Sequence, residues 1–239
     1  MISNTCGFDS VFHIIGNLAK LNTCLKAVIE QEPQISVLKI SKMFLNGEKA
    51  IYKERLNFLS AKFPVQQMHS GLQKIDCATT FSEVLELCFE NKIFHVFSHN
   101  DKHEEKIMSS MPVTYNVTKN IIIGPTICAC NIFIPQASQY FFVDILFYDE
   151  EQHEYPSVIE KKISELPSVF QHEQKNYVIK AFIGFRKPIL QRINAMGHFY
   201  AAIKSEDSSW HIWDDLKVSS YPAEKDEKIC PVAPFVCST

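Results

Sequence analysis

Residues 197–215 read GHFYAAIKSEDSSWHIWDD, and they contain two strand-like runs together with most of the chemistry in this part of the chain. The runs His198–Lys204 and Trp210–Trp213 are rich in aromatic and apolar residues, and a polar turn separates them. This pattern predicts an antiparallel hairpin. His198 opens the first strand and Asp214 follows the second, so we expect both side chains at the open end of the hairpin.

A carboxylate beside an imidazole fixes the tautomer of the ring and stabilises its protonated form. Asp214 is the expected partner of His198, and the adjacent Asp215 is the alternative because the sequence does not set the strand register. Cys6 stands just before a predicted helix over Asp9–Leu21, and a helix N-terminus favours a thiolate. A lone cysteine is also often a small buried apolar residue. The three residue types together are those of a Cys-His-Asp triad.

The rest of the chain changes from helical to strand-like patterning. Apolar residues at helical spacing predict helices over Asp9–Leu21, Ile35–Leu45 and Glu48–Phe63, and Thr80 with Glu83 forms a capping box that opens another. The predicted strands are Val117–Ile123, Ile127–Ile134, Tyr140–Phe147, Tyr177–Phe185, His198–Lys204 and Trp210–Trp213, with a short helix at Ser157–Leu166. Helices followed by strands predict an α+β fold in one compact domain over residues 1–239, mainly helical over 1–112 and mainly β over 113–239.

Composition narrows the class of protein. The 239 residues are 46% hydrophobic and 21% charged with a net charge of −3, which is typical of a globular protein and unlike a polybasic nucleic-acid binder. No apolar run reaches the ~18–20 residues of a membrane span. The segment MISNTCGFDS lacks the features of a signal peptide. We therefore expect an intracellular protein, cytoplasmic or nuclear, whose eight scattered cysteines are thiols and which binds neither nucleic acid nor membrane.

Two short motifs at opposite ends of the chain carry a family resemblance. Residues 4–10, NTCGFDS, resemble the cysteine box of the ubiquitin-specific proteases, N-T-C-Y-M-N-S. Residues 197–200, GHFY, followed by WHIWDD, resemble their histidine box, G-H-Y and then W-x-x-F-D-D. The closest resemblance is to the ubiquitin-specific-protease-like SUMO isopeptidase, because Asp9 stands where most members have Asn and residues 214–217 read DDLK.

The resemblance implies a papain-like cysteine protease fold, with a helical thumb lobe and an antiparallel-sheet palm and fingers. It implies a thiol isopeptidase that removes ubiquitin or a ubiquitin-like modifier such as SUMO from lysine, as a monomer and without a cofactor. Cys6 would be the nucleophile, His198 the proton acceptor and donor, and Asp214 the residue that orients His198. The family's substrates end in Gly-Gly and pass through a narrow channel. Its expected walls beside the histidine are Gly197, Phe199 and Tyr200.

Three departures from the family pattern affect these expectations. The position of the family's oxyanion-stabilising Asn holds Met1 here, so we expect Asn4 and the backbone N–H of Cys6 to supply the donors. An extended segment would place Asn4 and Cys6 on one side; alternatively, Asn4 only orders the turn before the helix. The two CxxC pairs of a zinc-binding finger are missing, and Cys128-Ala-Cys130 alone predicts no structural zinc. A nucleophile at position 6 leaves almost no preceding strand, as expected for a piece or shortened form of a longer polypeptide.

Other candidates have simpler interpretations. His95, His99 and His103 would share one face of a helix and could hold a metal, but the polar stretch around them is typical of a solvated helix face. Cys128 and Cys130 have apolar neighbours and are expected to pack in a core. Two other functions stay open: a catalytically inactive modifier-binding or scaffolding module of the same fold, and an acyl-transfer enzyme that uses the same triad.

Overall fold

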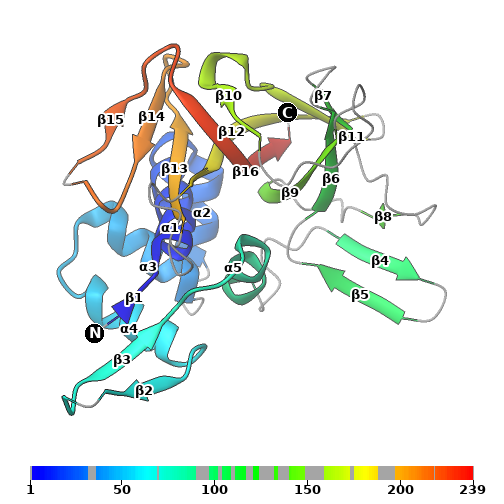
Figure 1. Cartoon of the computed structure of the whole chain (residues 1–239). Coiled ribbons are helices and arrows are strands. Elements are labelled where there is room, and N and C mark those ends of the chain that lie inside the picture. Colours follow the sequence, from blue (N-terminus) through cyan, green and yellow to red (C-terminus); the bar gives the residue numbers. More distant parts are fainter. Residues whose placement is uncertain are drawn as a thin grey trace.

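The computed structural model describes most of the chain, as helices followed mainly by strands (Figure 1). The described residues are 2–31, 36–68, 70–89, 97–101, 104–108, 111–116, 121–123, 132–133, 140–148, 159–172, 175–187, 197–217 and 219–238. The helices are α1 (Cys6–Leu21), α2 (Thr23–Gln31), α3 (Ser36–Asn46), α4 (Ile51–Ser60) and α5 (Phe81–Cys88), with a 3-10 turn at Ile163–Glu165. The strands are β1 (Ile2–Ser3), β2 (Val65–Gln67), β3 (Gln73–Asp76), β4 (Phe97–Asp101), β5 (Glu104–Met108), β6 (Met111–Asn116), β7 (Ile121–Ile123), β8 (Ile132–Phe133), β9 (Tyr140–Tyr148), β10 (Lys161–Lys162), β11 (Val169–His172), β12 (Lys175–Arg186), β13 (His198–Lys204), β14 (Trp210–Trp213), β15 (Tyr221–Pro222) and β16 (Lys228–Ser238).

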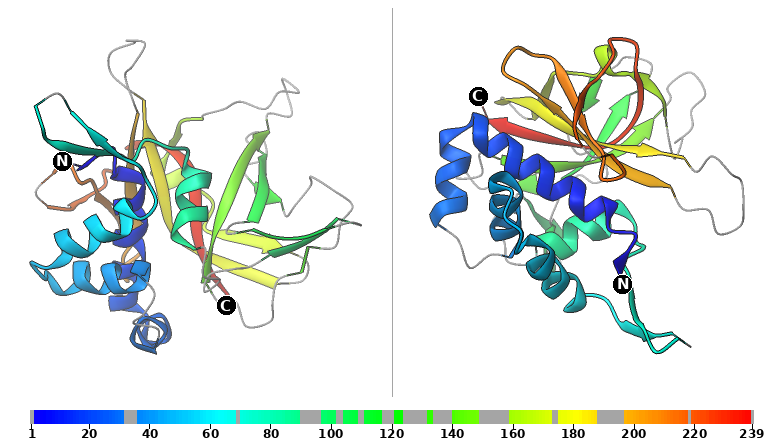
Figure 2. Two further views of the ribbon diagram at one scale, coloured as in Figure 1. Left: turned by 90° about the horizontal axis from the view of Figure 1, so that it is seen from below. Right: turned by 90° about the vertical axis from the view of Figure 1, so that its left-hand side faces the viewer.

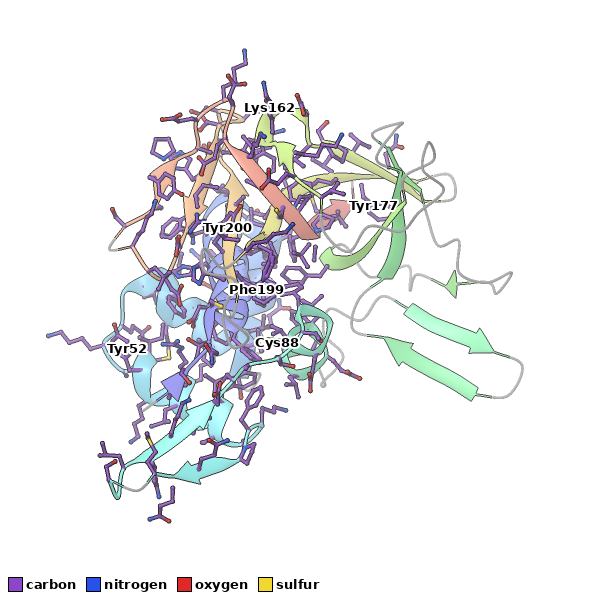
Figure 3. All side chains as sticks on the ribbon, viewed as in Figure 1. Tyr52, Cys88, Lys162, Tyr177, Phe199 and Tyr200 are labelled. Carbon is purple, nitrogen blue, oxygen red and sulfur yellow. The ribbon has the colours of Figure 1, made fainter. Side chains whose placement is uncertain are left out.

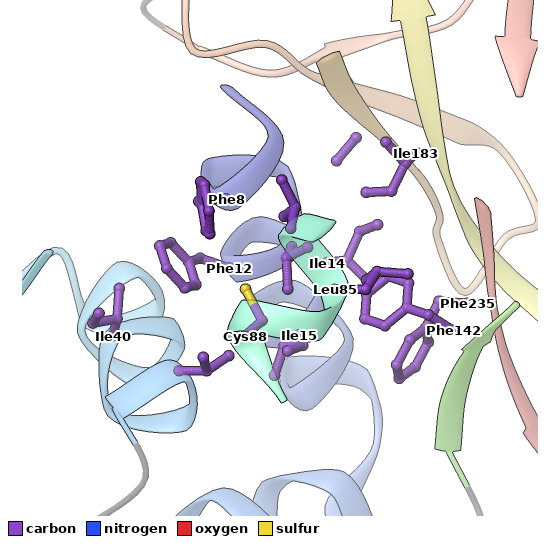
Figure 4. Packing of buried hydrophobic residues seen from close by; sticks show 14 of the residues in the cluster. Phe8, Phe12, Ile14, Ile15, Ile40, Leu85, Cys88, Phe142, Ile183 and Phe235 are labelled. Atoms are coloured by element: carbon purple, nitrogen blue, oxygen red, sulfur yellow. The ribbon is translucent and has the colours of Figure 1, made fainter. Parts of the chain in front are cut away.

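Helix α1 lies between the other helices and the largest sheet (Figure 2). Its apolar residues recur at the i, i+3, i+4 spacing of a broad stripe, and a helix with such a stripe buries it against other elements. Phe8, Phe12, Ile14 and Ile15 are fully buried. Figure 4 shows Phe8 and Phe12 on the side of α3, while residues of α5, β9, β12 and β16 fill the opposite side. Burial of each side chain of this size stabilises the fold by roughly 1.5–3 kcal/mol, so α1 contributes strongly to the core.

The largest sheet curls because β16 pairs with β12 in addition to its two neighbours in the strand order. Its order is β10-β16-β9-β6-β7-β11-β12-β13-β14-β15, and β16 also pairs with β12. Most of its pairings are antiparallel, whereas β6 with β9 and β7 with β11 run parallel. Helices packed on a curled and mainly antiparallel sheet confirm the mixed helix-and-sheet class that the sequence predicts.

The predicted hairpin has the expected boundaries. β13 and β14 pair antiparallel, with Ala201 opposite Trp213 and Lys204 opposite Trp210. On its other side, β13 pairs with β12, which places Arg186 opposite His198. His198 therefore begins a central strand, and Asp214 comes directly after the neighbouring one.

Most predicted helices are present with shifted ends. α1 begins at Cys6 rather than Asp9, so the cysteine is the first residue of the helix. α3 and α4 lie within or close to their predicted ranges. The Thr80 hydroxyl caps α5 by accepting from the backbone N–H of Glu83. α2, the β2–β3 hairpin and the long strand β16 are additional elements that the patterning did not predict.

The predicted helix at Ser157–Leu166 is wrong for its described part. Lys161 and Lys162 form β10 and pair with β16, and a single 3-10 turn follows. Leu166 has ψ of 141°. This extended angle is expected because Leu166 precedes a proline, and the proline ring disfavours the helical region for the residue before it. His99 lies in strand β4 and not in a helix, which removes the basis for a helical histidine face there; His95 and His103 lie outside the described residues. None of the described helices is both long and apolar enough to span a bilayer.

Replacement of Gly16 by alanine is expected to destabilise the fold. A Cβ at Gly16 would lie 2.7 Å from the backbone oxygen of Ser41 in α3, so the two helices would have to separate. Overpacking of this kind costs about 1–3 kcal/mol and outweighs the helix preference of alanine, which is worth about 1 kcal/mol. Chemical denaturation measures the change, with exposed Lys20→Ala on the same helix as the control. A Gly16→Ala variant as stable as the wild type would contradict this close contact.

Candidate active site

The hairpin brings His198 and Asp214 into direct contact. The His198 Nε2 atom lies 2.7 Å from the Asp214 Oδ1 atom. His198 is positioned by the β12–β13 register and Asp214 by the end of β14, so two neighbouring strands fix the pair. The open end of the hairpin therefore holds an oriented imidazole, as the sequence predicts.

Asp214 is held in place by further donors. Arg186 Nη1 donates to the Asp214 Oδ2 atom at 2.9 Å, and the backbone N–H of Leu216 donates to Oδ1 at 3.0 Å. Only 1% of the Asp214 side chain is exposed. Burial by itself would raise the pKa of Asp214, but the hydrogen bonds from Arg186, Leu216 and His198 hold it below its usual range. The carboxylate is thus charged and immobile at neutral pH.

Asp215 is the weaker candidate for the orienting role. Its Oδ1 atom lies 3.3 Å from His198 Nε2, and 28% of its side chain is exposed. Burial raises the pKa of Asp215, although the charges of His198 and Arg55 oppose this change. The shorter distance and deeper burial both favour Asp214.

Cys6 approaches the imidazole from the other half of the chain. The backbone N–H of Phe199, the residue after His198, donates to Cys6 Sγ at 3.4 Å, and the thiol lies near enough to the His198 ring to contribute to its raised pKa. Because Nε2 faces Asp214, the Nδ1 atom of His198 is the ring nitrogen left for the thiol. The start of α1 also places the sulfur beside the free N–H groups of a helix N-terminus, which stabilise a negative charge.

The electrostatic surroundings favour a charged His198. Burial acts to lower the pKa of His198, but the hydrogen bonds with Cys6 and Asp214 outweigh it and raise the pKa to about 9. At neutral pH the ring therefore holds a proton, which is the state required for a thiolate–imidazolium pair. His13, by contrast, is half-buried between Phe44 and Trp213, and desolvation together with the Arg55 charge lowers its pKa to about 4.

The segment before Cys6 is not extended, so the geometric basis of the Asn4 prediction is wrong. Asn4 has φ of 59° and Thr5 has helical angles, and this backbone removes the alternation that would align Asn4 with Cys6. The Asn4 Nδ2 atom instead donates to Asp76 Oδ1 on β3 at 2.7 Å. This contact favours the alternative role, in which Asn4 orders the turn before the helix.

The residues predicted to line a channel lie beside His198 but differ in exposure. Phe199 contacts Phe81 of α5 and Phe185 of β12, with ring centroids 5.5 Å and 5.1 Å apart, and is half-buried. Tyr200 projects from the opposite face of β13 and is buried (Figure 3). Its burial favours a packing role over that of a channel wall.

Two glycines allow this packing. A Cβ at Gly184 would lie 2.4 Å from the Tyr200 ring, and one at Gly197 would lie 1.9 Å from the Phe185 ring. Tyr200 in turn lies under Arg186, whose guanidinium carbon is 5.0 Å from the ring centroid. Arg186 is a site residue that the sequence reasoning missed. Arg186 directly follows the predicted strand Tyr177–Phe185, but the pairing of that strand with the histidine strand is known only from the structure.

The described residues contain one cluster with the spacing of metal ligands, and it consists of the site residues themselves. His198, Asp214 and Asp215 each place a ligand atom within 4.8 Å of the others. The Arg186 guanidinium donates to the second carboxylate oxygen of Asp214, and this cation would compete with a metal ion for the carboxylate. Cys128 and Cys130 lie outside the described residues, so the prediction about zinc stays untested.

The comparisons with known proteins support the fold. No family model matches the sequence, and no curated protein matches it. The structure is similar to a chain of the SAGA Ubp8/Sgf11/Sus1/Sgf73 DUB module bound to ubiquitin aldehyde, with a TM-score of 0.50 and 10% identity over 98% of this chain and 68% of that chain. A second match is the module bound to monoubiquitin, with a TM-score of 0.52, 10% identity and coverage of 98% and 67%. A third, the Ubp8-Sgf11-Sgf73-Sus1 SAGA DUB module, has a TM-score of 0.50, 10% identity and coverage of 99% and 66%.

At this identity the likeness shows the fold alone. The mixed helical and curled-sheet arrangement is that of a deubiquitinase module, and this chain spans about two thirds of the length of the matched chains. The family that the two sequence motifs indicate stays an expectation, because the likeness concerns the fold. The likeness gives no particular support to the SUMO isopeptidase branch.

Removal of the Asn4 side chain should affect stability and spare catalysis. Asn4→Gly keeps a residue that accepts positive φ but loses the bond to Asp76, so we expect a loss of about 1 kcal/mol. Asn4→Ala should lose more, because alanine is strained in the left-handed region. Thermal denaturation and the rate of modifier cleavage, measured side by side, test this expectation. A rate reduced ~10²–10³-fold in Asn4→Gly would restore the oxyanion role.

The imidazole of His198 should titrate near pH 9. A histidine whose pKa rises from 6.5 to about 9 on folding adds stability below about pH 6.5, and that stability is lost as the pH rises through 9. NMR titration of histidine-labelled protein measures the midpoint directly. Asp214→Asn should lower it, because the carboxylate is one cause of the shift. His13 serves as the internal control, with a midpoint near pH 4. A His198 midpoint near 6.5 in the wild type would contradict the proposed pair.

Proposed function

We propose that this protein is a thiol isopeptidase that removes ubiquitin or a ubiquitin-like modifier from lysine side chains. One observation carries the proposal: a cysteine at a helix N-terminus lies beside a histidine whose ring is in contact with a buried aspartate. They come from motifs at opposite ends of the chain. The fold likeness to deubiquitinase modules is independent support.

The chemistry follows from the order of contacts. Cys6 Sγ, having given its proton to His198, attacks the carbonyl carbon of the modifier's last residue and forms a C–S bond and a tetrahedral oxyanion. Collapse of this intermediate breaks the C–N bond, and His198 gives its proton to the leaving lysine amine. Water then attacks the thioester with His198 as the base, which releases the modifier acid and the free thiol. Asp214 keeps the ring oriented throughout.

Backbone donors are the proposed oxyanion hole. Cys6 is the first residue of α1, and the first N–H groups of a helix have no intrahelical acceptor and can bind an anion. In this arrangement the loss of the family's Asn, at the position of Met1, is compensated by the helix N-terminus. The Asn4 amide takes no part because it is bound to Asp76.

Ubiquitin is the modifier that we propose first, ahead of SUMO. Two of the matched modules carry ubiquitin aldehyde and monoubiquitin, which are ligands of those proteins. SUMO is the other candidate, because Asp9 and the DDLK run resemble the SUMO isopeptidase branch. Phe199 and Gly197 are the proposed contacts of the Gly-Gly tail beside His198.

A catalytically inactive modifier-binding module is the second candidate. The observation that favours it is Met1 at the position of the usual oxyanion donor. Such a module would bind the modifier without forming a covalent adduct. The contact of Cys6 with His198 favours the active enzyme.

A ubiquitin or SUMO probe with an electrophilic C-terminus distinguishes the two candidates. We expect one probe to label Cys6, and Cys6→Ala to abolish labelling without loss of fold. Cys24→Ala, which removes an exposed thiol on α2, is the matched control and should label normally. An unlabelled wild type that still binds the modifier would establish the inactive module.

The same assay ranks the other site residues. His198→Ala should be nearly as severe as Cys6→Ala, because the pair acts as a unit. Asp214→Ala should be milder, and Asp215→Ala milder still, since Asp215 is farther from the imidazole. The reverse order of the two aspartates would move the orienting role to Asp215. A chelator should leave labelling unchanged, and dependence on zinc would overturn the metal-free mechanism.

A further inference from the structure

A buried carboxylate lies one turn from the candidate nucleophile and belongs to no step of the proposed chemistry. Asp9 stands in the first turn of α1 and is only 3% exposed. A buried carboxylate is strongly destabilising unless it is paired and hydrogen-bonded. Its partners therefore show what holds this turn in place.

Arg55 of α4 binds both residues that bracket the cysteine. Its Nη2 atom lies 2.5 Å from the Asp9 Oδ2 atom and also donates to the Thr5 hydroxyl. The Thr5 hydroxyl in turn donates to Asp9 Oδ2 at 2.7 Å, and the Asp9 backbone N–H donates to the Thr5 carbonyl at 3.0 Å. Cys6 lies inside this closed set of bonds, so its backbone cannot turn without breaking one of them.

Apolar packing from the same helix supports the arrangement. Phe58 lies one turn from Arg55 on α4, on the same face. Its ring meets Phe8 at 6.2 Å and Phe12 at 5.9 Å between centroids. α4 thus holds the start of α1 by a charged contact beside the thiol and an aromatic contact behind it.

The guanidinium also acts on the base side of the site. The charge of Arg55 lowers the pKa of Asp215, opposing its burial, and Asp215 lies 3.3 Å from His198. Asp9, Arg55 and Asp215 line one cavity of about 500 Å³. Arg55 therefore faces acids from both the nucleophile helix and the histidine hairpin.

We propose that Arg55 is a positioning residue for the isopeptidase reaction, holding the first turn of α1 through Asp9 and Thr5 so that the Cys6 thiol faces His198. The inference rests on the proposed function, but the placement of the thiol can be tested without it. Arg55 bonds to Thr5 and Asp9 and acts on the reacting thiol only through them. Its loss should therefore lower kcat and leave KM for the modifier conjugate unchanged.

The test compares Arg55→Met with Arg55→Lys and with Glu54→Gln. Glu54→Gln breaks the Lys39–Glu54 ion pair, an exposed contact between α3 and α4, and is the matched control. The measurements are kcat and KM on a ubiquitin or SUMO conjugate, and the rate at which iodoacetamide alkylates Cys6. We expect Arg55→Met to reduce both kcat and alkylation by about 10–100-fold, as for a misplacement of about 1 Å. Arg55→Lys should recover only part of the rate because one ammonium cannot reproduce the guanidinium fork.

A double variant keeps the outcome clear if Arg55→Met unfolds. Asp9→Asn with Arg55→Met removes the unpaired buried charge and should recover the melting temperature while kcat and alkylation stay low. If the double variant also recovers kcat and alkylation, or if Arg55→Met is as reactive as the wild type, Arg55 has only a structural role and the proposal is overturned. If the wild type shows no cleavage but Arg55→Met still slows alkylation, the isopeptidase assignment fails and the positioning role stands.

Discussion

The site depends on the burial of α1. This helix packs against α3, α5 and the sheet, and its first residue is Cys6. Because the core fixes the helix axis, the direction of the thiol is set by the first turn alone. Gly16 permits the close approach of α3, and Phe8 and Phe12 lock the rotation of the helix about its axis. A cysteine at the end of a mobile segment could not keep a fixed contact with a strand from the other end of the chain.

The sheet fixes the position of the imidazole, as the buried helix fixes that of the thiol. His198 begins a strand that is paired on both sides, with β12 and with β14, so its backbone has little freedom. Arg186 comes from one neighbouring strand and Asp214 follows the other, and they bond to each other across His198. The Tyr200 ring packs against the Arg186 guanidinium. The orientation of one ring thus depends on three adjacent strands and on a buried aromatic side chain.

Local patterns could be predicted from the sequence, and long-range pairings could not. The hairpin carrying His198 and Asp214 is formed by neighbouring residues, so its spacing appears in the sequence. β16 was missed because Pro231 and Pro234 interrupt its pattern. They are accommodated opposite Gly184 and Phe182, next to points where the strand register shifts.

The residues that hold the site in place could not be predicted from the sequence either. Arg186 and Arg55 act from other elements through packing that no spacing in the sequence records. The extended backbone assumed for Asn4 was wrong for a local reason: a left-handed residue followed by a helical one turns the chain directly into α1. The motif residues could be predicted from the sequence, whereas the partners that hold them came from the structure.

The balance of charge around the thiol gives a reason for an aspartate at position 9. The site contains the cations Arg55, Arg186 and the protonated His198, and the single carboxylate of Asp214 is paired with both Arg186 and His198. If residue 9 were an uncharged asparagine, the Nη2 atom of Arg55 would lose its buried carboxylate, and Asp215, which lines the same cavity, would be an alternative partner. The guanidinium would then compete with His198 for that carboxylate. With Asp9 ionised, Nη2 of Arg55 is paired on the α1 side, and Asp215 faces the imidazolium. An acidic residue at position 9 and an arginine at position 55 are therefore expected to occur together in proteins that share this arrangement.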